Sequence, residues 1–367
     1  MTSKSTRIGF IGASKGASWA DGSHIPYLKS SRNQSYTVTA LQNSSKASAE
    51  KNAAAFELPD AKAFYDNPKD IANDPNVDLV AVSIKVPDHY AAIMSALQAG
   101  KDIFVEWPLA ANLKDAEEVT QLAKEKGVRS LVGLQARQNP SIIAVKKMID
   151  NGELGDILGT TMHGYGIIFG PTGPEQYGYM YPISAGANLL TIPCGHAIDA
   201  LCWVLGELGY VSATLANRRP TVSVVNGDGK VVGEAKKEVH DVVSINGELE
   251  KGGVVNVVYE GGMNPVGGPS FFWQINGTKG SVVLEGEYGH VQMFQPKVKF
   301  AKTGEEAKDV DVKWVGNDFS HGVGEAWDAL AGNGDGHLTT FEDALVRHKM
   351  VDAIYRSNDS GKREKYL

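Results

Sequence analysis

The chain has 367 residues, more than one hydrophobic core usually holds, so two domains are expected. Its 43 acidic residues outnumber its 36 basic ones, and the net charge of -7 argues against a nucleic-acid-binding surface. No run of about 18 apolar residues is present, so no membrane span is expected.

The start of the chain and its two cysteines bear on the cellular compartment. Residues 1–7 contain no apolar signal region and pass directly into a strand pattern. Cys194 and Cys202 flank a helical segment and are expected to fill a core rather than form a disulfide. These features predict a cytoplasmic protein.

In the first part of the chain, expected strands alternate with expected helices. The strands are predicted over residues 7–12, 36–41, 77–84, 102–105 and 130–134, and the helices over 24–28, 47–56, 89–99 and 113–126. The run at 77–84 is largely apolar, as expected of a strand buried on both faces. The alternation predicts a parallel, doubly wound sheet, and therefore an α/β Rossmann domain over residues 1–139.

Beyond Pro140 strands dominate. After a helix at 141–150, strands are predicted over residues 157–163, 211–215, 239–248, 253–259, 271–276, 281–285 and 291–294. Many alternate apolar and polar residues, as in a sheet with one covered face. Further helices are expected at 195–205, 319–330 and 340–357, the last a candidate to pack back on the first domain. Residues 140–367 are thus expected to form an α+β domain with an open, mostly antiparallel sheet.

A glycine-containing loop, Gly12-Ala13-Ser14-Lys15-Gly16-Ala17, follows the first expected strand. A dinucleotide fingerprint has three glycines there, so that the backbone approaches the pyrophosphate at a helix N-terminus. The first glycine is kept, while Ser14 replaces the second and Ala17 the third. Ser14 adds a hydroxyl donor and Lys15 a cation. We predict dinucleotide binding; the alternative is an ordinary turn between a strand and a helix.

The end of the second strand distinguishes a ribose 2′-hydroxyl from a 2′-phosphate, because an acidic residue there favours NAD. The stretch after residue 41 is Gln42-Asn43-Ser44-Ser45-Lys46, with no acid until Glu50. The amide of Asn43, the hydroxyl of Ser44 and the ammonium of Lys46 suit a phosphate better. The prediction is therefore NADP, with NAD as the alternative.

Several short motifs appear in a specific order along the chain. They are Val86-Pro87-Asp88-His89, Ala99-Gly100-Lys101, Glu106-Trp107-Pro108, Arg137 with Pro140, Asn151-Gly152-Glu153-Leu154-Gly155-Asp156, Gly195-His196-Ala197-Ile198-Asp199 and Asn276-Gly277-Thr278-Lys279-Gly280. With them, nearly the whole chain resembles the glucose–fructose oxidoreductase/inositol dehydrogenase family. The resemblance implies cofactor contacts from Val86, Pro87, His89, Glu106 and Trp107, and a homodimer formed through the outer face of the second domain's sheet.

Two of these motifs are closer to one branch of that family. Phe104-Val105-Glu106-Trp107 and Gly195-His196-Ala197-Ile198-Asp199 resemble the fungal branch that includes the yeast galactose-pathway repressor. The repressor is similar in fold to these oxidoreductases and binds NAD(P). The resemblance therefore implies an alternative function, a regulator without catalysis that binds a protein partner.

The residues for proton transfer depart from the family pattern. The family supplies a lysine from Glu-Lys-Pro and a histidine preceded four residues earlier by an acid. Here His196 is kept, Trp107 replaces the lysine, and Ile192 stands in the place of the acid. An indole donates hydrogen bonds but transfers no proton at neutral pH. Lys85, at the carboxyl end of the buried strand that faces the ligand crevice, is our hypothesis for the replacement; the alternative is a lysine that extends into solvent.

The substrate site is predicted from residue types and placement. Arg137 follows the fifth strand and faces the crevice, and Asp199 lies one turn after His196, either orienting it or facing the polar side of the helix. Tyr179 and Tyr181 either stack on a sugar-like substrate or pack a loop, and Trp107 is expected beside the substrate. The histidines show no metal-ligand spacing, so no metal is predicted.

Together these features predict an NAD(P)-dependent oxidoreductase acting on a small sugar-like or other carbonyl or alcohol substrate, with Lys85 and His196 as catalytic residues. Two alternatives stay open. One is the regulator described above, and the other is a tightly held cofactor used in an internal redox cycle or an epimerisation. The substrate is not encoded in any local motif.

Overall fold

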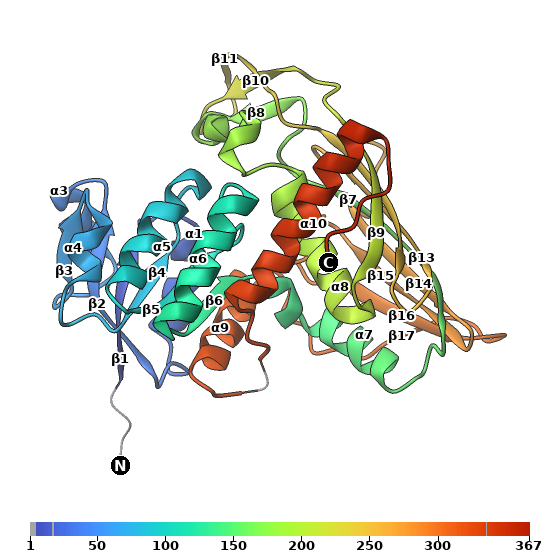
Figure 1. Ribbon diagram of the computed structural model, residues 1–367, viewed down its shortest axis with the longest axis horizontal. Coiled ribbons are helices and arrows are strands. Elements are labelled where there is room, and N and C mark those ends of the chain that lie inside the picture. Colours follow the sequence, from blue (N-terminus) through green and yellow to red (C-terminus); the bar gives the residue numbers. More distant parts are fainter. Residues whose placement is uncertain (1–4, 17, 335) are drawn as a thin grey trace. The chain divides into compact units, whose positions relative to one another are not determined.

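The computed structural model describes residues 5–16, 18–334 and 336–367 (Figure 1). Ala17 of the glycine-containing loop lies outside the described residues. Contacts divide the chain into a first unit, Met1–Leu134 with Asp318–Leu345, and a second unit, Gln135–Asn317 with Val346–Leu367. The sequence places the boundary near 139/140 and assigns everything after it to the second domain, whereas the contacts return residues 318–345 to the first unit.

The first unit contains a six-stranded parallel sheet in the order β3-β2-β1-β4-β5-β6. Its strands are β1 (Thr6–Ile11), β2 (Tyr36–Asn43), β3 (Lys62–Tyr65), β4 (Leu79–Val82), β5 (Asp102–Glu106) and β6 (Ser130–Gly133). This confirms the predicted Rossmann domain. The strand order reverses between β1 and β4, and in open parallel sheets ligands bind at that point, outside the carboxyl ends of the strands.

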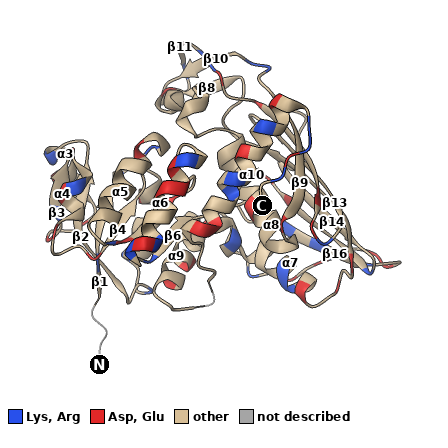
Figure 2. Cartoon of the chain, in the orientation of Figure 1, with Lys and Arg blue, Asp and Glu red and all other residues tan. Residues whose placement is uncertain are grey.

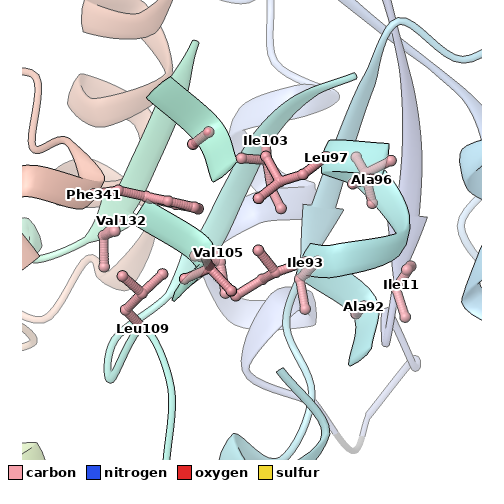
Figure 3. Packing of buried hydrophobic residues seen from close by; sticks show 14 of the residues in the cluster. Ile11, Ala92, Ile93, Ala96, Leu97, Ile103, Val105, Leu109, Val132 and Phe341 are labelled. Carbon is pink, nitrogen blue, oxygen red and sulfur yellow. The ribbon is translucent and has the colours of Figure 1, made fainter. Parts of the chain in front are cut away.

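Helices cover both faces of this sheet. They are α1 (Trp19–Gly22), α2 (His24–Leu28), α3 (Lys46–Ala55), α4 (Pro68–Ala72), α5 (His89–Gln98), α6 (Leu113–Lys126) and α9 (Phe319–Leu330), with the short 3-10 helix η1 (Val86–Asp88). Successive side chains of a strand point to opposite faces. Ile103 and Val105 of β5 therefore join one buried cluster, with Ile93 and Leu97 of α5 (Figure 3), while Phe104 joins a second.

Helix α6 shows how local sequence sets an element and its orientation. Asn112 caps its start by accepting a hydrogen bond from the backbone N–H of Asp115 at 2.9 Å, and Gly127 ends it with a φ of 63°. Charged residues mark the helix along its length (Figure 2), while Ala116 and Val119 are buried. The apolar stripe thus fixes which side of α6 faces the sheet.

Polar contacts of Trp327 explain why α9 belongs to the first unit. The fully buried indole donates a hydrogen bond from Nε1 to Nδ1 of His24 at 3.1 Å. Its backbone carbonyl accepts from the hydroxyl of Tyr36 at 3.0 Å, and the next residue, Asp328, accepts from Tyr27. Because these partners lie about 300 residues earlier in the chain, local sequence patterns do not reveal the association.

The second unit contains an eight-stranded sheet in the order β17-β16-β15-β14-β7-β13-β12-β9, in which only the β13–β7 pair is parallel. Its strands are β7 (Ile157–Tyr165), β9 (Leu208–Ala216), β12 (Val242–Leu249), β13 (Val254–Glu260), β14 (Phe271–Gly277), β15 (Gly280–Gly286), β16 (Lys297–Lys302) and β17 (Lys308–Asp309). The predicted open, mostly antiparallel sheet is confirmed. Helices α7 (Pro140–Asp150), α8 (Gly195–Leu205) and α10 (Phe341–Ser360) lie beside it (Figure 1).

Some elements of the second unit differ from the sequence prediction. The strand expected at 291–294 is a turn, because the N–H groups of Met293 and Phe294 both donate to the carbonyl of His290. A small sheet of β8 (Thr172–Pro174), β10 (Thr221–Val225) and β11 (Val231–Lys236) was not predicted. Cys194 and Cys202 are both buried and free, as the sequence indicates. No helix within the described residues has the length and apolar character to cross a membrane.

Candidate functional site

A cavity of about 590 Å³ opens in the first unit at the carboxyl ends of β1, β2 and β4. Of the predicted cofactor-binding residues, Gly12, Ser14, Asn43 and Ser44 line it, and so does Lys85. The cavity lies where the strand order reverses, which is the ligand position expected for this kind of sheet.

The turn at Gly12 brings the ends of β1 and β4 together. Its φ is +98°, and a Cβ placed there would lie 2.2 Å from the carbonyl oxygen of Ser83, so only glycine fits. Ala13, the next residue, is fully buried. Gly12 lines the cavity. A tight turn at this place is the role of the first glycine in a dinucleotide fingerprint.

The rest of the loop is held by its own chain. The N–H of Ser14 donates to the hydroxyl of Ser18, and that of Lys15 to Oδ1 of Asn52, both at 2.9 Å. Asp21 accepts from the N–H of Gly16 at 2.7 Å and from Nζ of Lys15 at 3.0 Å. Burial opposes ionisation of Asp21, but these hydrogen bonds outweigh it and lower its pKa. Lys15 and Gly16 do not line the cavity.

Two amide oxygens at the end of β2 lack hydrogen-bond partners among the residues that the structure describes. Nδ2 of Asn43 donates to the carbonyl of Ala13 at 2.9 Å and to Oγ of Ser14 at 3.0 Å, which fixes the orientation of the amide. Oδ1 of Asn43 is left unpaired, as is Oε1 of the buried Gln42. Since a buried acceptor without a donor is costly, this pair fits the hydroxyls of a ribose.

Lys46, predicted to favour a 2′-phosphate, lies on α3 outside the cavity lining. It is exposed, and its Nζ stands 3.7 Å from Oε1 of Glu50 on the next helical turn. The hydroxyl of Ser45 caps this helix by accepting from the N–H of Ser48 at 3.2 Å.

His89 connects the loops that follow β4 and β5. Its Nδ1 lies 2.9 Å from the carbonyl oxygen of Pro108, and its Nε2 lies 3.2 Å from that of Ile84. Burial lowers the pKa of His89, and the contacts with these carbonyls oppose that shift. Val86 is buried and Pro87 exposed in η1, and none of the three lines the cavity. They position the loop that carries Lys85.

Glu106, at the end of β5, is anchored by a residue that the sequence analysis missed. Its Oε1 lies 2.5 Å from Nε2 of His24. Because Trp327 donates to Nδ1 of the same ring, the imidazole proton is on Nε2, which donates to Glu106. Gly133 stands beside this carboxylate; a Cβ there would lie 2.7 Å from Oε2. The contact joins positions 82 residues apart, and no local signal reveals it.

Trp107 and Lys85 occupy different environments. Trp107 is 5% exposed and packs in the apolar cluster that includes Leu109 and Ala110. Lys85 is exposed, immediately precedes η1 and lines the cavity. The lysine therefore stands at the crevice edge that the strand order predicts.

His196 begins α8, directly after the π-helical turn η5 (Leu190–Cys194). The residue is 3% exposed, and its Nδ1 has no hydrogen-bond partner in the described part of the chain. Burial, assisted by the nearby His290, lowers the pKa of His196 to about 3. With Ile192 in place of an acid, no carboxylate from that position opposes the shift. His196 is thus a neutral imidazole and a weaker base than an ordinary histidine.

Arg137 and Asp199 form an ion pair with each other. Nε and Nη2 of Arg137 donate to the two carboxylate oxygens of Asp199 at 2.8 and 2.7 Å, and both side chains are buried. Arg347, which the sequence analysis missed, lies 3.6 Å from Asp199 and also contacts Glu207. Asp199 is therefore the centre of a buried ionic cluster.

The two predicted tyrosines lie in or next to η3 (Glu175–Met180). Tyr181 is buried, and its carbonyl accepts from the N–H groups of Glu238 and Val239 at 3.0 and 3.2 Å. Tyr179 is partly exposed. Their contact with a substrate stays a prediction.

Comparisons with known proteins match both units. The model of an oxidoreductase family with an NAD-binding Rossmann fold matches residues 6–134, and that of the C-terminal domain of Gal80p matches residues 140–286. The dehydrogenase aclE of Aspergillus oryzae is 33% identical over 99% of both chains. The galactose/lactose metabolism regulatory protein GAL80 of Kluyveromyces lactis is 30% identical over 80% of this chain and 66% of its own length.

Solved structures with the same overall fold include a regulator and a dehydrogenase. The super-repressor mutant of Gal80p from Saccharomyces cerevisiae has a TM-score of 0.90 and 25% identity, covering 99% of this chain and 98% of that one. Levoglucosan dehydrogenase in complex with NADH and levoglucosan has a TM-score of 0.81 at 19% identity, covering 99% of this chain and 100% of that one. The second likeness concerns the fold alone.

We expect Asp199→Asn to lower the free energy of unfolding by about 3–5 kcal/mol, because it removes the carboxylate that pairs with the buried guanidinium of Arg137 and one of the two carboxylates beside the buried Arg347. Asp150→Asn is the control, since Asp150 pairs with Lys146 at the surface and its loss should cost about 0.5 kcal/mol or less. Urea unfolding followed by circular dichroism measures both. Equal, small effects would contradict a structural role for the cluster.

The low pKa of His196 predicts a specific loss of stability in acid. Below the ordinary histidine value of 6.5 the unfolded chain binds a proton at this position and the folded chain does not, so stability falls with falling pH. By about pH 5 the loss reaches about 2 kcal/mol. His196→Asn should therefore unfold with a weaker pH dependence between about pH 7.5 and about pH 5. The half-exposed His163, replaced by Gln, controls for removal of a histidine; an unchanged slope in His196→Asn would refute the assignment.

Proposed function

Because the chain belongs to the oxidoreductase family with an NAD-binding Rossmann fold, in the branch with a Gal80p-like C-terminal domain, we propose that it is an NAD(P)-dependent oxidoreductase of a small sugar-like or other carbonyl or alcohol substrate. The observation that carries the proposal is the cavity at the carboxyl ends of β1, β2 and β4. Position 12 in its lining accepts only glycine, and the lining also includes Gln42 and Asn43, whose buried amide oxygens have no donor among the described residues. The 33% identity to a dehydrogenase over the whole chain supports it.

A bound nicotinamide dinucleotide would supply the hydride exchange. Gly12 would let the backbone approach it, while Gln42 and Asn43 would accept hydrogen bonds from ribose hydroxyls. We assign Lys85 the role of an ammonium that hydrogen-bonds a substrate oxygen and polarises it, since the indole of Trp107 transfers no proton at neutral pH. His196, held neutral by burial, would take the proton that an alcohol loses as its hydride leaves, and its low pKa would make it pass that proton on to water. Arg137, Asp199, Tyr179 and Tyr181 are kept as proposed substrate-binding residues, the first two acting through their mutual ion pair.

The sequence predicts NADP from the absence of an acid after β2, from its amide and hydroxyl groups and from Lys46. The negative charge of Glu50 beside Lys46 weakens the attraction of Lys46 for a phosphate. Because Lys46 also lies outside the cavity lining, the choice between NAD and NADP is left to other residues. The cofactor is proposed as NAD(P).

One face of the eight-stranded sheet supports a homodimer. Val258, His163 and Phe272 form a cross-strand row on adjacent strands and are all partly exposed. Apolar side chains on such a face suit the same face of a second copy. We expect light scattering to give twice the chain mass of 39.3 kDa, and Val258→Glu to shift the protein toward the monomer. A monomer at micromolar concentration would refute the dimer.

A regulator is the second candidate, because three observations weaken catalysis. Trp107 stands where the family resemblance places a lysine, Ile192 where it places an acid, and the N–H groups of Ser14, Lys15 and Gly16 already have acceptors in the chain. Two of the similar proteins are named as galactose/lactose metabolism regulatory proteins. Such a role requires a stoichiometric complex with a protein partner and no turnover.

Turnover separates the two functions. The full chain is mixed with NAD⁺ or NADP⁺ and a panel of sugars and polyols, and the absorbance of reduced nicotinamide is followed. We expect a substrate-dependent rise, and a loss of at least about 100-fold in kcat for Lys85→Met. Lys69→Met is the control, because Lys69 is exposed on α4 and does not line the cavity. Activity of Lys85→Met within a few-fold of wild type would remove Lys85 from the mechanism, and no turnover together with a stoichiometric complex would favour the regulator.

A further inference from the structure

An acidic residue from outside β2, Asp66, lines the same cavity as Gln42 and Asn43, whose amide oxygens have no donor among the described residues. Asp66 directly follows β3 and lines the cavity together with Asn43 and Ser44. β2 and β3 are parallel neighbours in which Asn43 pairs with Tyr65. Asp66 is therefore the next residue along β3, as Ser44 is along β2, at a strand spacing of about 4.8 Å.

The backbone holds Asp66 in a defined conformation. Its φ is +65°, in the left-handed region that aspartate tolerates better than most residues. The following N–H, that of Asn67, donates to the carbonyl of Tyr65 at 2.9 Å. Asn67 then caps α4 by accepting from the N–H of Lys69 at 3.1 Å. The turn from β3 into α4 thus fixes the backbone from which the side chain of Asp66 extends.

The groups at this end of the cavity accept hydrogen bonds. Oδ1 of Asn43 and Oε1 of Gln42 have no donor among the described residues, and Asp66 adds a negative charge. The lysine of the cavity lining, Lys85, follows β4, three strand positions from β3 and so about 14 Å away. Hydrogen-bond acceptors and a carboxylate at this end of the cavity favour the two ribose hydroxyls of NAD and repel the 2′-phosphate of NADP.

We propose that Asp66 is the residue that makes this chain select NAD over NADP. The carboxylate and the two amide oxygens accept hydrogen bonds from the ribose hydroxyls of NAD, and the same carboxylate excludes the 2′-phosphate of NADP by repulsion. In dinucleotide-binding folds an acid at the end of β2 has this role. Here the position on β2 is an amide, and the neighbouring strand supplies the charge. The inference rests on the proposed dinucleotide binding and reverses the preference predicted from the sequence.

Binding, rather than turnover, tests the inference. The full chain is titrated with NADH and separately with NADPH, and the nicotinamide fluorescence gives the two dissociation constants. Asp66→Asn removes the charge and keeps a residue that tolerates a positive φ, and Asp66→Gly removes the side chain without backbone strain. Asp70→Asn is the matched control, because Asp70 is an exposed acid on α4 outside the cavity lining.

We expect the wild-type chain to bind NADH at least about tenfold more tightly than NADPH. Both Asp66 variants should narrow that ratio about tenfold, mainly by tighter NADPH binding, and Asp70→Asn should keep the wild-type ratio. Added salt should also narrow the wild-type ratio, because it screens the repulsion.

Other outcomes overturn the inference in distinguishable ways. A wild-type chain that binds NADPH as tightly as NADH, or Asp66 variants that keep the wild-type ratio, would remove Asp66 as the determinant and leave dinucleotide binding intact. Binding of neither dinucleotide would overturn the proposed function together with the inference.

Discussion

The close approach of Gly12 to the carbonyl of Ser83 is the constraint on which the nucleotide-binding half of the molecule depends. A Cβ at position 12 would lie 2.2 Å from that oxygen, so the ends of β1 and β4 approach each other only with glycine there. The approach opens the cavity on the side where β2 and β3 end. Gly12, Gln42, Asn43 and Asp66, which we assign to the dinucleotide, and Lys85, which we assign to the substrate, all line this cavity.

Several polar residues of this molecule hold the fold together. Asp21 holds the glycine-containing loop, His24 anchors Glu106, and Asp199 joins two arginines. Buried charges are tolerated only when they are paired, so each such residue needs a partner from elsewhere in the chain. A charged side chain next to a predicted crevice is therefore weak evidence for a ligand until its partner is known.

The proton-transfer groups explain why an enzyme and a regulator are both compatible with this fold. A buried His196 with a lowered pKa is a weaker base than an ordinary histidine, and Trp107 fills an apolar cluster instead of exchanging protons. In the proposed mechanism catalysis therefore depends on Lys85, which lines the cavity. A chain in which this lysine did not act on a substrate would still have the cavity, and a regulator could use it to bind a dinucleotide.

The sequence by itself determined the two-domain architecture, the parallel character of the first sheet and the glycine turn, because apolar runs, helix caps and glycines act on their immediate neighbours. The edge strand β3 was not predicted. The sequence also placed Lys85 at the crevice edge, since the carboxyl ends of buried parallel strands face the ligand crevice. Tertiary structure alone decided the return of α9 to the first unit, the Glu106–His24 contact, the pairing of Arg137 with Asp199 and the arrival of Asp66 beside Asn43. These are pairings of polar groups between distant positions, and a polar residue carries no local mark of the partner it will meet when the chain folds.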